Sequence, residues 1–133
     1  MARVRLLTSA KRLAGPLTYW VHRPQDGDTW ARATRFDPPL PPPDASGAFP
    51  HYTVEHLGHE VGFASAAEVD HALDVLARDP LPTAQELAQA AGAPERAYMH
   101  WIETFPARLK AVDERRRFVQ LLEELRGKIA AEA

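Results

Sequence analysis

The sequence of 133 residues contains no cysteine. Disulfide bonds, thiolate zinc sites and cysteine nucleophiles are therefore excluded, and the absence fits a protein of the reducing cytoplasm. The chain also lacks a run of the roughly 18 apolar residues that a membrane span needs. Its first residues lack the apolar core of a signal peptide. We therefore expect a cytoplasmic protein with no membrane partner.

Sequence motifs of enzymes are missing as well. There is no glycine-rich phosphate loop, no dinucleotide-binding fingerprint and no His-Glu-x-x-His zinc motif. The serines are Ser9, Ser46 and Ser65, and none of them lies in the Gly-x-Ser-x-Gly turn that exposes a nucleophile. We therefore expect a protein that is not an enzyme and that uses no cofactor.

Charge of one sign does not dominate the chain, because the formal net charge is only -2. Nothing therefore draws the whole protein toward nucleic acid or an anionic surface. The charge is uneven, however: basic residues exceed acidic ones over residues 1–46, and acidic residues exceed basic ones over residues 47–81. Lysine is scarce relative to arginine, which is typical of a high-GC bacterial or phage genome; the lysines are Lys11, Lys110 and Lys128.

The first third of the chain is rich in residues that favour strands. Residues 3–7 are predicted to form a short strand, and residues 17–22 (LTYWVH) a longer one. Residues 25–28 contain Asp-Gly and predict a turn, after which residues 29–36 return as the second strand of a hairpin.

Proline then interrupts the pattern. Residues 37–47 read DPPLPPPDASG, and this density of proline excludes a helix or a central strand. The segment is predicted to be an extended connector, and the alternative is a ligand for an aromatic-lined groove on a partner. Residues 51–57 and 60–64 are predicted to form a second hairpin that turns at Gly58.

The period of the apolar residues changes after this hairpin. Ser65 and Glu68 have the spacing of a capping box and begin a helix that is expected to end near Asp79-Pro80. Thr83 and Glu86 form a second capping box for a short helix that ends at Gly92. Pro94 is expected to begin a third helix that reaches residue 105. A fourth helix over residues 108–130 carries one apolar face: Phe118, Leu121, Leu122, Leu125 and Ile129.

These elements predict an α+β fold, with N-terminal β-hairpins followed by a C-terminal helical region of about four helices. The β-rich region covers residues 1–64 and includes the connector at 37–47, and the helical region covers residues 65–133. At this length the two regions are expected to form one compact domain.

Residues 83–103 (TAQELAQAAGAPERAYMHWIE) have the spacing of two helices joined by a tight turn. Ala88 and Ala91 are small enough for the helices to approach, and Gly92 can take the left-handed conformation that turns the chain. Tyr98 and Trp101 are placed to fill the space between them. The segment resembles the helix-turn-helix of bacterial and phage DNA-binding regulators, and the alternative is a helical corner that packs the core.

The resemblance implies a site on duplex DNA. Arg96, Met99 and His100 then meet base edges, since they follow the turn where a recognition helix begins. The phosphate contacts are expected from the basic residues that come next along the chain: Arg108, Lys110, Arg115 and Arg116. The sequence departs from the regulators at Tyr98, where they usually carry a β-branched residue.

Other functions stay open at this point. The leading hypothesis is a non-enzymatic binding or accessory module, in its most specific form a DNA-associated regulatory protein. A second is an interaction or assembly subunit that binds a protein partner, or its own copy, through the last helix. A third is a small metal-binding domain or enzyme with histidine ligands, for which the candidates are His56, His59 and His71.

One further pattern concerns the aromatic residues of the N-terminal region. Arginines alternate with them along residues 19–36, which is typical of proteins that stack single-stranded nucleic acid on aromatic rings. Packing in the core of a hairpin is the alternative. The residues concerned are Tyr19, Trp20, Arg23, Trp30, Arg32, Arg35 and Phe36.

Overall fold

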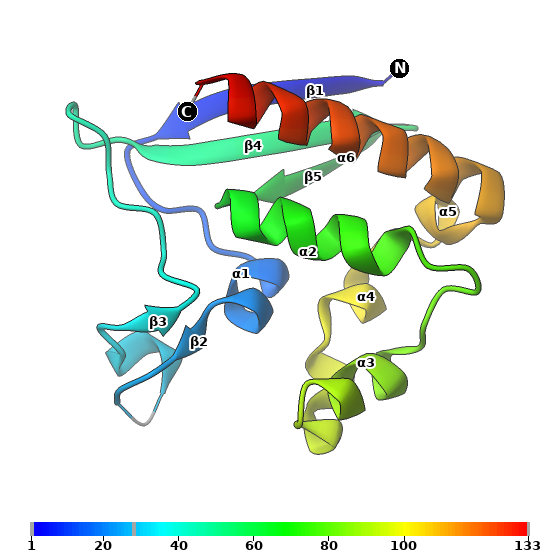
Figure 1. Cartoon of the computed structure of the whole chain (residues 1–133), viewed down its shortest axis with the longest axis horizontal. Coiled ribbons are helices and arrows are strands. Elements are labelled where there is room, and N and C mark those ends of the chain that lie inside the picture. Colours follow the sequence, from blue (N-terminus) through cyan, green and yellow to red (C-terminus); the bar gives the residue numbers. More distant parts are fainter. Residues whose placement is uncertain (1, 28, 133) are drawn as a thin grey trace.

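A three-stranded antiparallel sheet runs through the upper part of the molecule in Figure 1. Its strands are β1 (Arg3–Ser9), β4 (Phe49–His56) and β5 (His59–Phe63), in the order β1-β4-β5. The structure is a computed structural model that describes residues 2–27 and 29–132. The predicted α+β class is confirmed, because the sheet strands precede a mainly helical region.

The hairpin of β4 and β5 turns where the sequence predicts. Leu57 and Gly58 form its two-residue turn, and both have positive φ angles, of 53° and 78°. This is the backbone of the turn type whose twist matches that of the flanking strands. The register pairs Val54 with Val61, which sets the apolar residues of both strands on one face.

Two helices cover that face. They are α2 (Ala66–Leu76) and α6 (Val112–Glu132), which lie side by side in front of the sheet in Figure 1. Their apolar stripes meet the inward residues of the strands, as Val54, Val69 and Leu122 are fully buried. The predicted apolar face of the last helix is confirmed, with Phe118 and Leu125 also at 0% exposure. Burial of this kind contributes about 25 cal/mol per Å² of apolar surface.

The predicted strand over residues 17–22 is wrong. These residues lie in helix α1 (Pro16–Val21), which begins after Gly15. Pro16 favours the first turn of a helix, and the Thr18 hydroxyl accepts a hydrogen bond from the Gly15 amide at 3.1 Å. Helical spacing also buries Leu17 and Trp20 together, so tertiary packing outweighs the strand preference of Thr-Tyr-Trp-Val.

The predicted returning strand over residues 29–36 is wrong as well. Thr29 caps a 3₁₀-helix, η1 (Trp30–Arg32), and strand structure is limited to β2 (Arg23–Pro24) and β3 (Phe36–Asp37). The Asp26 carboxylate accepts hydrogen bonds from the backbone amides of Thr34 and Arg35, at 2.8 and 2.9 Å, which bends the chain between the two strands. Gly27 has the positive φ that the predicted turn requires, and Asp28 lies outside the described residues.

The proline-rich connector is confirmed as irregular: residues 38–48 form no helix or strand. In Figure 1 this segment leads from the small β2–β3 ladder up to the sheet. It therefore joins two parts of the molecule that differ in regularity.

The remaining helices are shorter than predicted. The Thr83–Glu86 capping box is confirmed and begins α3 (Ala84–Ala90), and Gly92 has a φ of 78°. The next segment is a 3₁₀-helix, η2 (Pro94–Met99), followed by α4 (Trp101–Thr104) and α5 (Ala107–Lys110).

The single helix predicted from Pro94 to residue 105 is therefore wrong. His100 has a ψ of 138°, and its Nδ1 accepts a hydrogen bond from the Ile102 amide, so it ends one helix and caps the next. The last helix begins at Val112 rather than 108, because Ala111 is extended. Among the described residues, none of the helices combines the length and the apolar character needed to cross a membrane.

Candidate functional site

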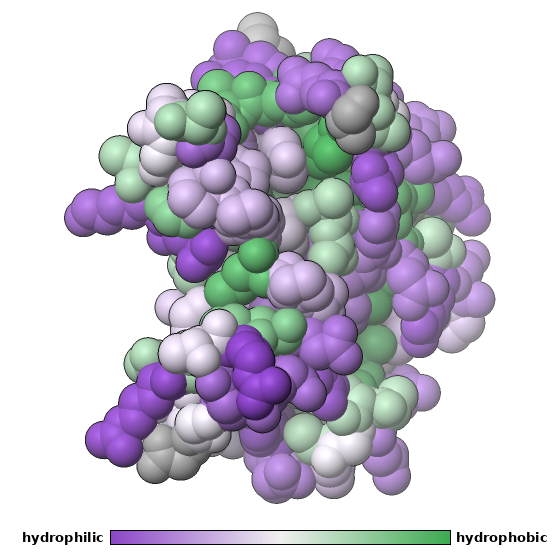
Figure 2. Space-filling view, turned by 60° about the vertical axis from the view of Figure 1, so that its left-hand side comes forward, coloured by the Kyte–Doolittle hydropathy of each residue, from purple (hydrophilic) through white to green (hydrophobic). Residues whose placement is uncertain are grey.

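A groove of about 630 Å³ opens beside α1 and the β2–β3 ladder. Four short elements form it: α1, β2, η1 and η2. Figure 2 brings this side of the molecule forward and shows hydrophilic and hydrophobic residues intermixed, without a continuous apolar patch. The lining residues are Tyr19, Trp20, Arg23, Pro24, Thr29, Trp30, Ala93, Arg96 and Met99. We call this hollow the aromatic–arginine groove.

Trp30 holds the aromatic wall of the groove in place. Its indole nitrogen donates a hydrogen bond to the His22 carbonyl at 3.0 Å. Tyr19 meets it edge to face, with ring centroids 4.8 Å apart, and Phe36 packs on it at the same distance. Tyr19 remains 47% exposed. The groove thus offers one flat, accessible ring on a rigid aromatic support.

The positive charge of the groove comes from two arginines. The Arg96 guanidinium lies 5.7 Å from the centre of the Trp20 ring, and Arg23 donates a hydrogen bond to the Ala91 carbonyl at 3.0 Å. Both side chains are exposed. The lining residues that the structure describes include no carboxylate. A planar ligand with negative charge therefore finds rings to stack on and guanidinium groups to pair with.

A buried polar network fixes α1 and so the position of the groove. The Glu68 carboxylate accepts hydrogen bonds from the hydroxyls of Thr18 and Ser65, at 2.9 and 3.0 Å. His22 is fully buried, with Nε2 at 2.7 Å from the Ser65 hydroxyl and Nδ1 at 2.7 Å from the Pro38 carbonyl. Burial by itself lowers the pKa of His22, but its hydrogen bonds to Glu68 and Pro38 and the Glu68 charge outweigh this and raise it.

Two further histidines lie behind the groove. The His100 ring packs on Trp20 with centroids 4.5 Å apart, and His71 accepts a hydrogen bond from the Trp101 indole at 2.9 Å. Burial, aided by the neighbouring His71, lowers the pKa of His100 to about 4. Burial is also the main reason that the pKa of His71 is lowered. Both rings are thus neutral at pH 7, and His100 packs on Trp20 without adding charge.

The residues predicted to meet base edges have different surroundings. Arg96 and Met99 line the aromatic–arginine groove, and Met99 is 50% exposed. His100 is only 1% exposed, because its side chain caps α4 and packs inside. The expectation that His100 faces outward is wrong, because the chain is extended at His100 and the predicted continuous helix is interrupted there.

The predicted phosphate contacts are divided in the same way. Arg115 is 6% exposed and donates hydrogen bonds to the carbonyls of Leu76 and Lys110, at 3.2 and 2.6 Å, so it terminates α2 instead of facing solvent. Arg116 and Arg108 are exposed, and Arg116 lies 3.8 Å from Asp79. In Figure 1, α5 and the start of α6 are well separated from the end of the molecule that carries α3. The two predicted sets do not form one surface.

The histidines considered as metal ligands have separate partners. His56 Nε2 lies 2.7 Å from a Glu114 oxygen, His71 faces Trp101, and His59 lines a different groove. Within residues 2–27 and 29–132, no cluster of three or more His, Asp or Glu side chains is arranged to hold a metal ion.

The apolar face of the last helix packs mostly within the protein's own core, and Val112 at its start is 46% exposed. Its residues Phe118, Leu121 and Leu122 are at most 2% exposed within the protein's own core.

No family model matches the chain, and no curated protein or solved structure is significantly similar to it.

The aromatic residues of the groove were predictable from the sequence, although they lie on α1 and η1 instead of a hairpin. The contact of Arg96 with Trp20 was not predictable, because the two residues lie far apart in the sequence. The Thr18–Glu68 hydrogen bond was not predictable for the same reason. The capping-box spacing of Ser65 and Glu68 indicates that Glu68 accepts hydrogen bonds at the start of α2, but it does not indicate Thr18 as a donor.

Proposed function

We propose that this protein is a non-enzymatic binding module whose aromatic–arginine groove holds single-stranded nucleic acid. The observation that carries the proposal is the placement of the exposed Tyr19 ring and the Trp30 ring beside Arg23 and Arg96 in one open groove. The proposal keeps the predicted association with nucleic acid but makes the ligand a single strand, in a groove where Arg96 and Met99 lie beside the aromatic residues of the N-terminal region.

The chemistry of the groove supports this ligand. A base that stacks on an aromatic ring gains about 1–3 kcal/mol, and every base has a face that can stack. An arginine can form two parallel hydrogen bonds to a phosphate, and its charge releases counterions from the strand. The groove volume of about 630 Å³ lies within the common range for a small-molecule site, so it holds one or two nucleotides of a longer strand.

The geometry favours a single strand over a duplex. A duplex reader places a recognition helix in the major groove, whereas η2 is a 3₁₀-helix of 6 residues that ends at the buried His100. Arg115, which is expected to reach a phosphate, is instead held by the carbonyl groups at the end of α2.

The test is fluorescence anisotropy of a labelled oligothymidine of about 12 nucleotides, titrated with the protein at two salt concentrations. We expect micromolar binding that weakens as salt rises, with a slope of about -0.7 for each phosphate contacted. Quenching of tryptophan emission on binding reports on Trp20 and Trp30. A duplex of the same length is expected to bind more weakly.

Tyr19→Ala and Arg96→Ala are the informative variants, because both side chains are exposed and their loss leaves the core intact. Each is expected to weaken binding about tenfold, which corresponds to about 1.4 kcal/mol. Arg117→Ala is the matched control, since Arg117 is exposed on α6. Equal loss in the control, or tighter binding to the duplex that depends on Arg116, would contradict the proposal.

A further inference from the structure

The outer edge of β5 is open to another strand. In an antiparallel pair, opposite residues alternate between exchanging two hydrogen bonds and exchanging none. The two-residue turn at Leu57-Gly58 closes on a hydrogen-bonded pair, so His59, Val61 and Phe63 direct their backbone groups to β4. Glu60 and Gly62 therefore direct their N–H and C=O groups away from the sheet.

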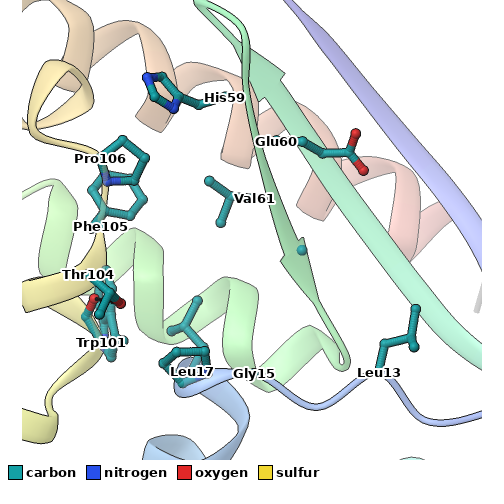
Figure 3. Close-up of a pocket in the computed structure, with 12 residues that line it drawn as sticks. Leu13, Gly15, Leu17, His59, Glu60, Val61, Trp101, Thr104, Phe105 and Pro106 are labelled. Carbon is teal, nitrogen blue, oxygen red and sulfur yellow. Dashed lines mark hydrogen bonds between the residues drawn. The ribbon is translucent and has the colours of Figure 1, made fainter.

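A groove of about 360 Å³ lies along this edge. Figure 3 shows His59 and Val61 projecting from β5 toward it, with Phe105 and Pro106 on the opposite side. Leu17 and Trp101 border it from α1 and α4, and Leu13 stands at its far end. The walls are mainly apolar, apart from Glu60, His59 and Thr104. We call this hollow the β5-edge groove.

The edge has little protection against strand pairing beyond the charge of Glu60. Edge strands are commonly blunted by charged side chains, above all lysine, and by proline or a bulge. β5 has no lysine, proline or bulge, because its sequence is His-Glu-Val-Gly-Phe and its register with β4 is unbroken. Gly62 has no side chain, and the space beside it is filled by the His51 ring, whose Cε1 lies 3.0 Å from where a Cβ would stand.

We propose that an extended peptide segment of another protein binds in the β5-edge groove as a fourth strand of the sheet. The outward groups of Glu60 and Gly62 supply two donors and two acceptors to its backbone, one of each per residue. The peptide carries apolar side chains at alternate positions, where they meet Val61 and Phe105. This inference is independent of the nucleic-acid proposal, because the two grooves have different lining residues.

Charge complementarity identifies the residue between those apolar positions. The Glu60 side chain is 47% exposed, and its nearest cation is Arg5, with Nη2 at 3.6 Å. On an added strand the residue beside Glu60 points to the same face of the sheet. A lysine or arginine at that position pairs with the carboxylate, whereas an acidic residue there is repelled.

A single extended segment fits the groove better than a second folded copy. Neighbouring strands lie about 4.8 Å apart, so an added strand occupies the space directly beside β5. Trp101, Phe105 and Pro106 stand across that space and leave room for one chain without its own covering helices.

The probe is a fluorescein-labelled peptide of about nine residues that alternates valine with lysine and threonine. We expect saturable binding in anisotropy, and slower amide hydrogen exchange at Glu60 and Gly62 in NMR spectra of the complex. The amide of Val61, already paired with β4, is expected to change little and serves as the internal reference.

Glu60→Pro removes the outward N–H and keeps the β4 ladder, because proline is tolerated on an edge strand where its nitrogen faces away from the partner. It is expected to weaken the peptide at least about tenfold. Glu60→Gln is the matched control: it removes only the charge and is expected to weaken a lysine peptide about threefold and a threonine peptide not at all. Leu13→Ala, at a side chain that is 46% exposed, removes apolar contact and is expected to weaken both peptides.

Circular dichroism shows whether Glu60→Pro folds. If it does not, two sets of N-methylated peptides are compared. The first set is methylated at residues whose N–H groups point to β5, and the second at the residues between them. Only the first set is expected to lose binding. Absence of binding by the unmodified peptide, or equal binding by both sets, would overturn the proposal. Concentration-dependent self-association that Glu60→Pro abolishes would also overturn it, in favour of a second copy of this chain.

Discussion

The sheet layer and the groove end of this protein are held together by different forces. In the sheet layer, β1, β4 and β5 present apolar residues to α2 and α6 with regular periods, so the core between them is apolar. Single polar contacts, such as His56 to Glu114 and Arg126 to Asp70, add to this apolar packing. At the groove end, short elements surround the aromatic–arginine groove and are fixed by particular hydrogen bonds, such as Trp30 to His22 and Thr18 to Glu68. Regular burial defines a fold, whereas specific polar bonds position a site on it.

The two regions meet at α1. Its residues Leu17 and Trp20 are buried, while Tyr19 on the same short helix is exposed in the groove. The network of His22, Ser65 and Glu68 joins this helix to the start of α2. These few hydrogen bonds therefore position the groove relative to the sheet layer. The following substitutions test whether the two regions can be destabilised independently.

The largest effect is expected from Phe118→Ala in the sheet layer. Phe118 is fully buried and packs edge to face on Phe105 at 5.3 Å. Its loss creates a cavity and is expected to lower the free energy of unfolding by about 3–5 kcal/mol. Urea unfolding followed by tryptophan emission, which reports Trp20 and Trp30 at the groove and Trp101 beside Phe105, is expected to shift together with circular dichroism. Two separate transitions would show that the regions fold independently.

A smaller effect, and one that depends on pH, is expected at His100. Its folded-state pKa of about 4 lies below the value of 6.5 in the unfolded chain. The contribution of His100 to the free energy of unfolding is therefore fully present above pH 6.5 and is lost as the pH falls toward 4. This histidine alone is expected to remove about 2–3 kcal/mol between pH 7.5 and 4.5. His100→Asn keeps a capping side chain and is expected to flatten that part of the urea-unfolding profile. An unchanged slope would assign the acid sensitivity to other groups.

The pH dependence that His22 adds to the stability is opposite to that of His100. Its pKa is raised in the folded state, so its contribution to stability is complete below pH 6.5 and is lost as the pH rises through the raised pKa. The low-pH limb of the stability profile thus reports on His100 beside Trp20, and the high-pH limb reports on His22 at the end of α1.

Glu68→Gln is expected to lower stability by about 2 kcal/mol, because it leaves buried hydroxyl groups with a poorer acceptor. Glu68 is 1% exposed, whereas Glu123 is exposed on α6 and Glu123→Gln serves as the control. The Glu68 variant is also expected to increase amide exchange in α1 before the sheet strands, as measured by native-state hydrogen exchange. Uniform loosening of both regions would remove the distinction between them.

The smallest effect on stability is expected from Arg96→Ala, within about 0.5 kcal/mol, because the side chain is exposed. The same change is expected to weaken nucleic-acid binding about tenfold. Thermal unfolding and anisotropy on one sample separate the two readouts. A large loss of stability would show that the contact with Trp20 is structural.

The difference between the regions also explains which features were predictable. The Gly58 hairpin and the Thr83 capping box follow from local patterns, and the structure confirms both. The apolar face of α6 was likewise predictable from its period. Each of these features is specified by residues that are neighbours in the sequence or recur along it.

Predictions at the groove end were wrong because distant residues decide the local structure there. Residues 17–22 prefer strands by composition. In the structure, however, Thr18 forms a buried hydrogen bond with Glu68, and His22 forms one with Ser65. The burial of the His100 ring depends on its packing against Trp20, which lies in α1. Distant residues decide one site in the sheet layer as well: the sequence predicts a solvent-exposed Arg115 on α6, whereas its burial depends on carbonyl groups at the end of α2.

The pairing of β1 with β4 bears on the order in which the chain acquires structure. Arg3 to Ser9 have no strand partner until Glu55 to Phe49 are present, and α1 lacks its polar anchor until residue 68. Synthesis runs from the N-terminus, so residues 10–48 are made before the strand that pairs with β1. A fragment of residues 1–48 is thus expected to remain unfolded in isolation. The aromatic–arginine groove, formed partly by Tyr19 and Trp20 and partly by Arg96 and Met99, is among the last features to be completed.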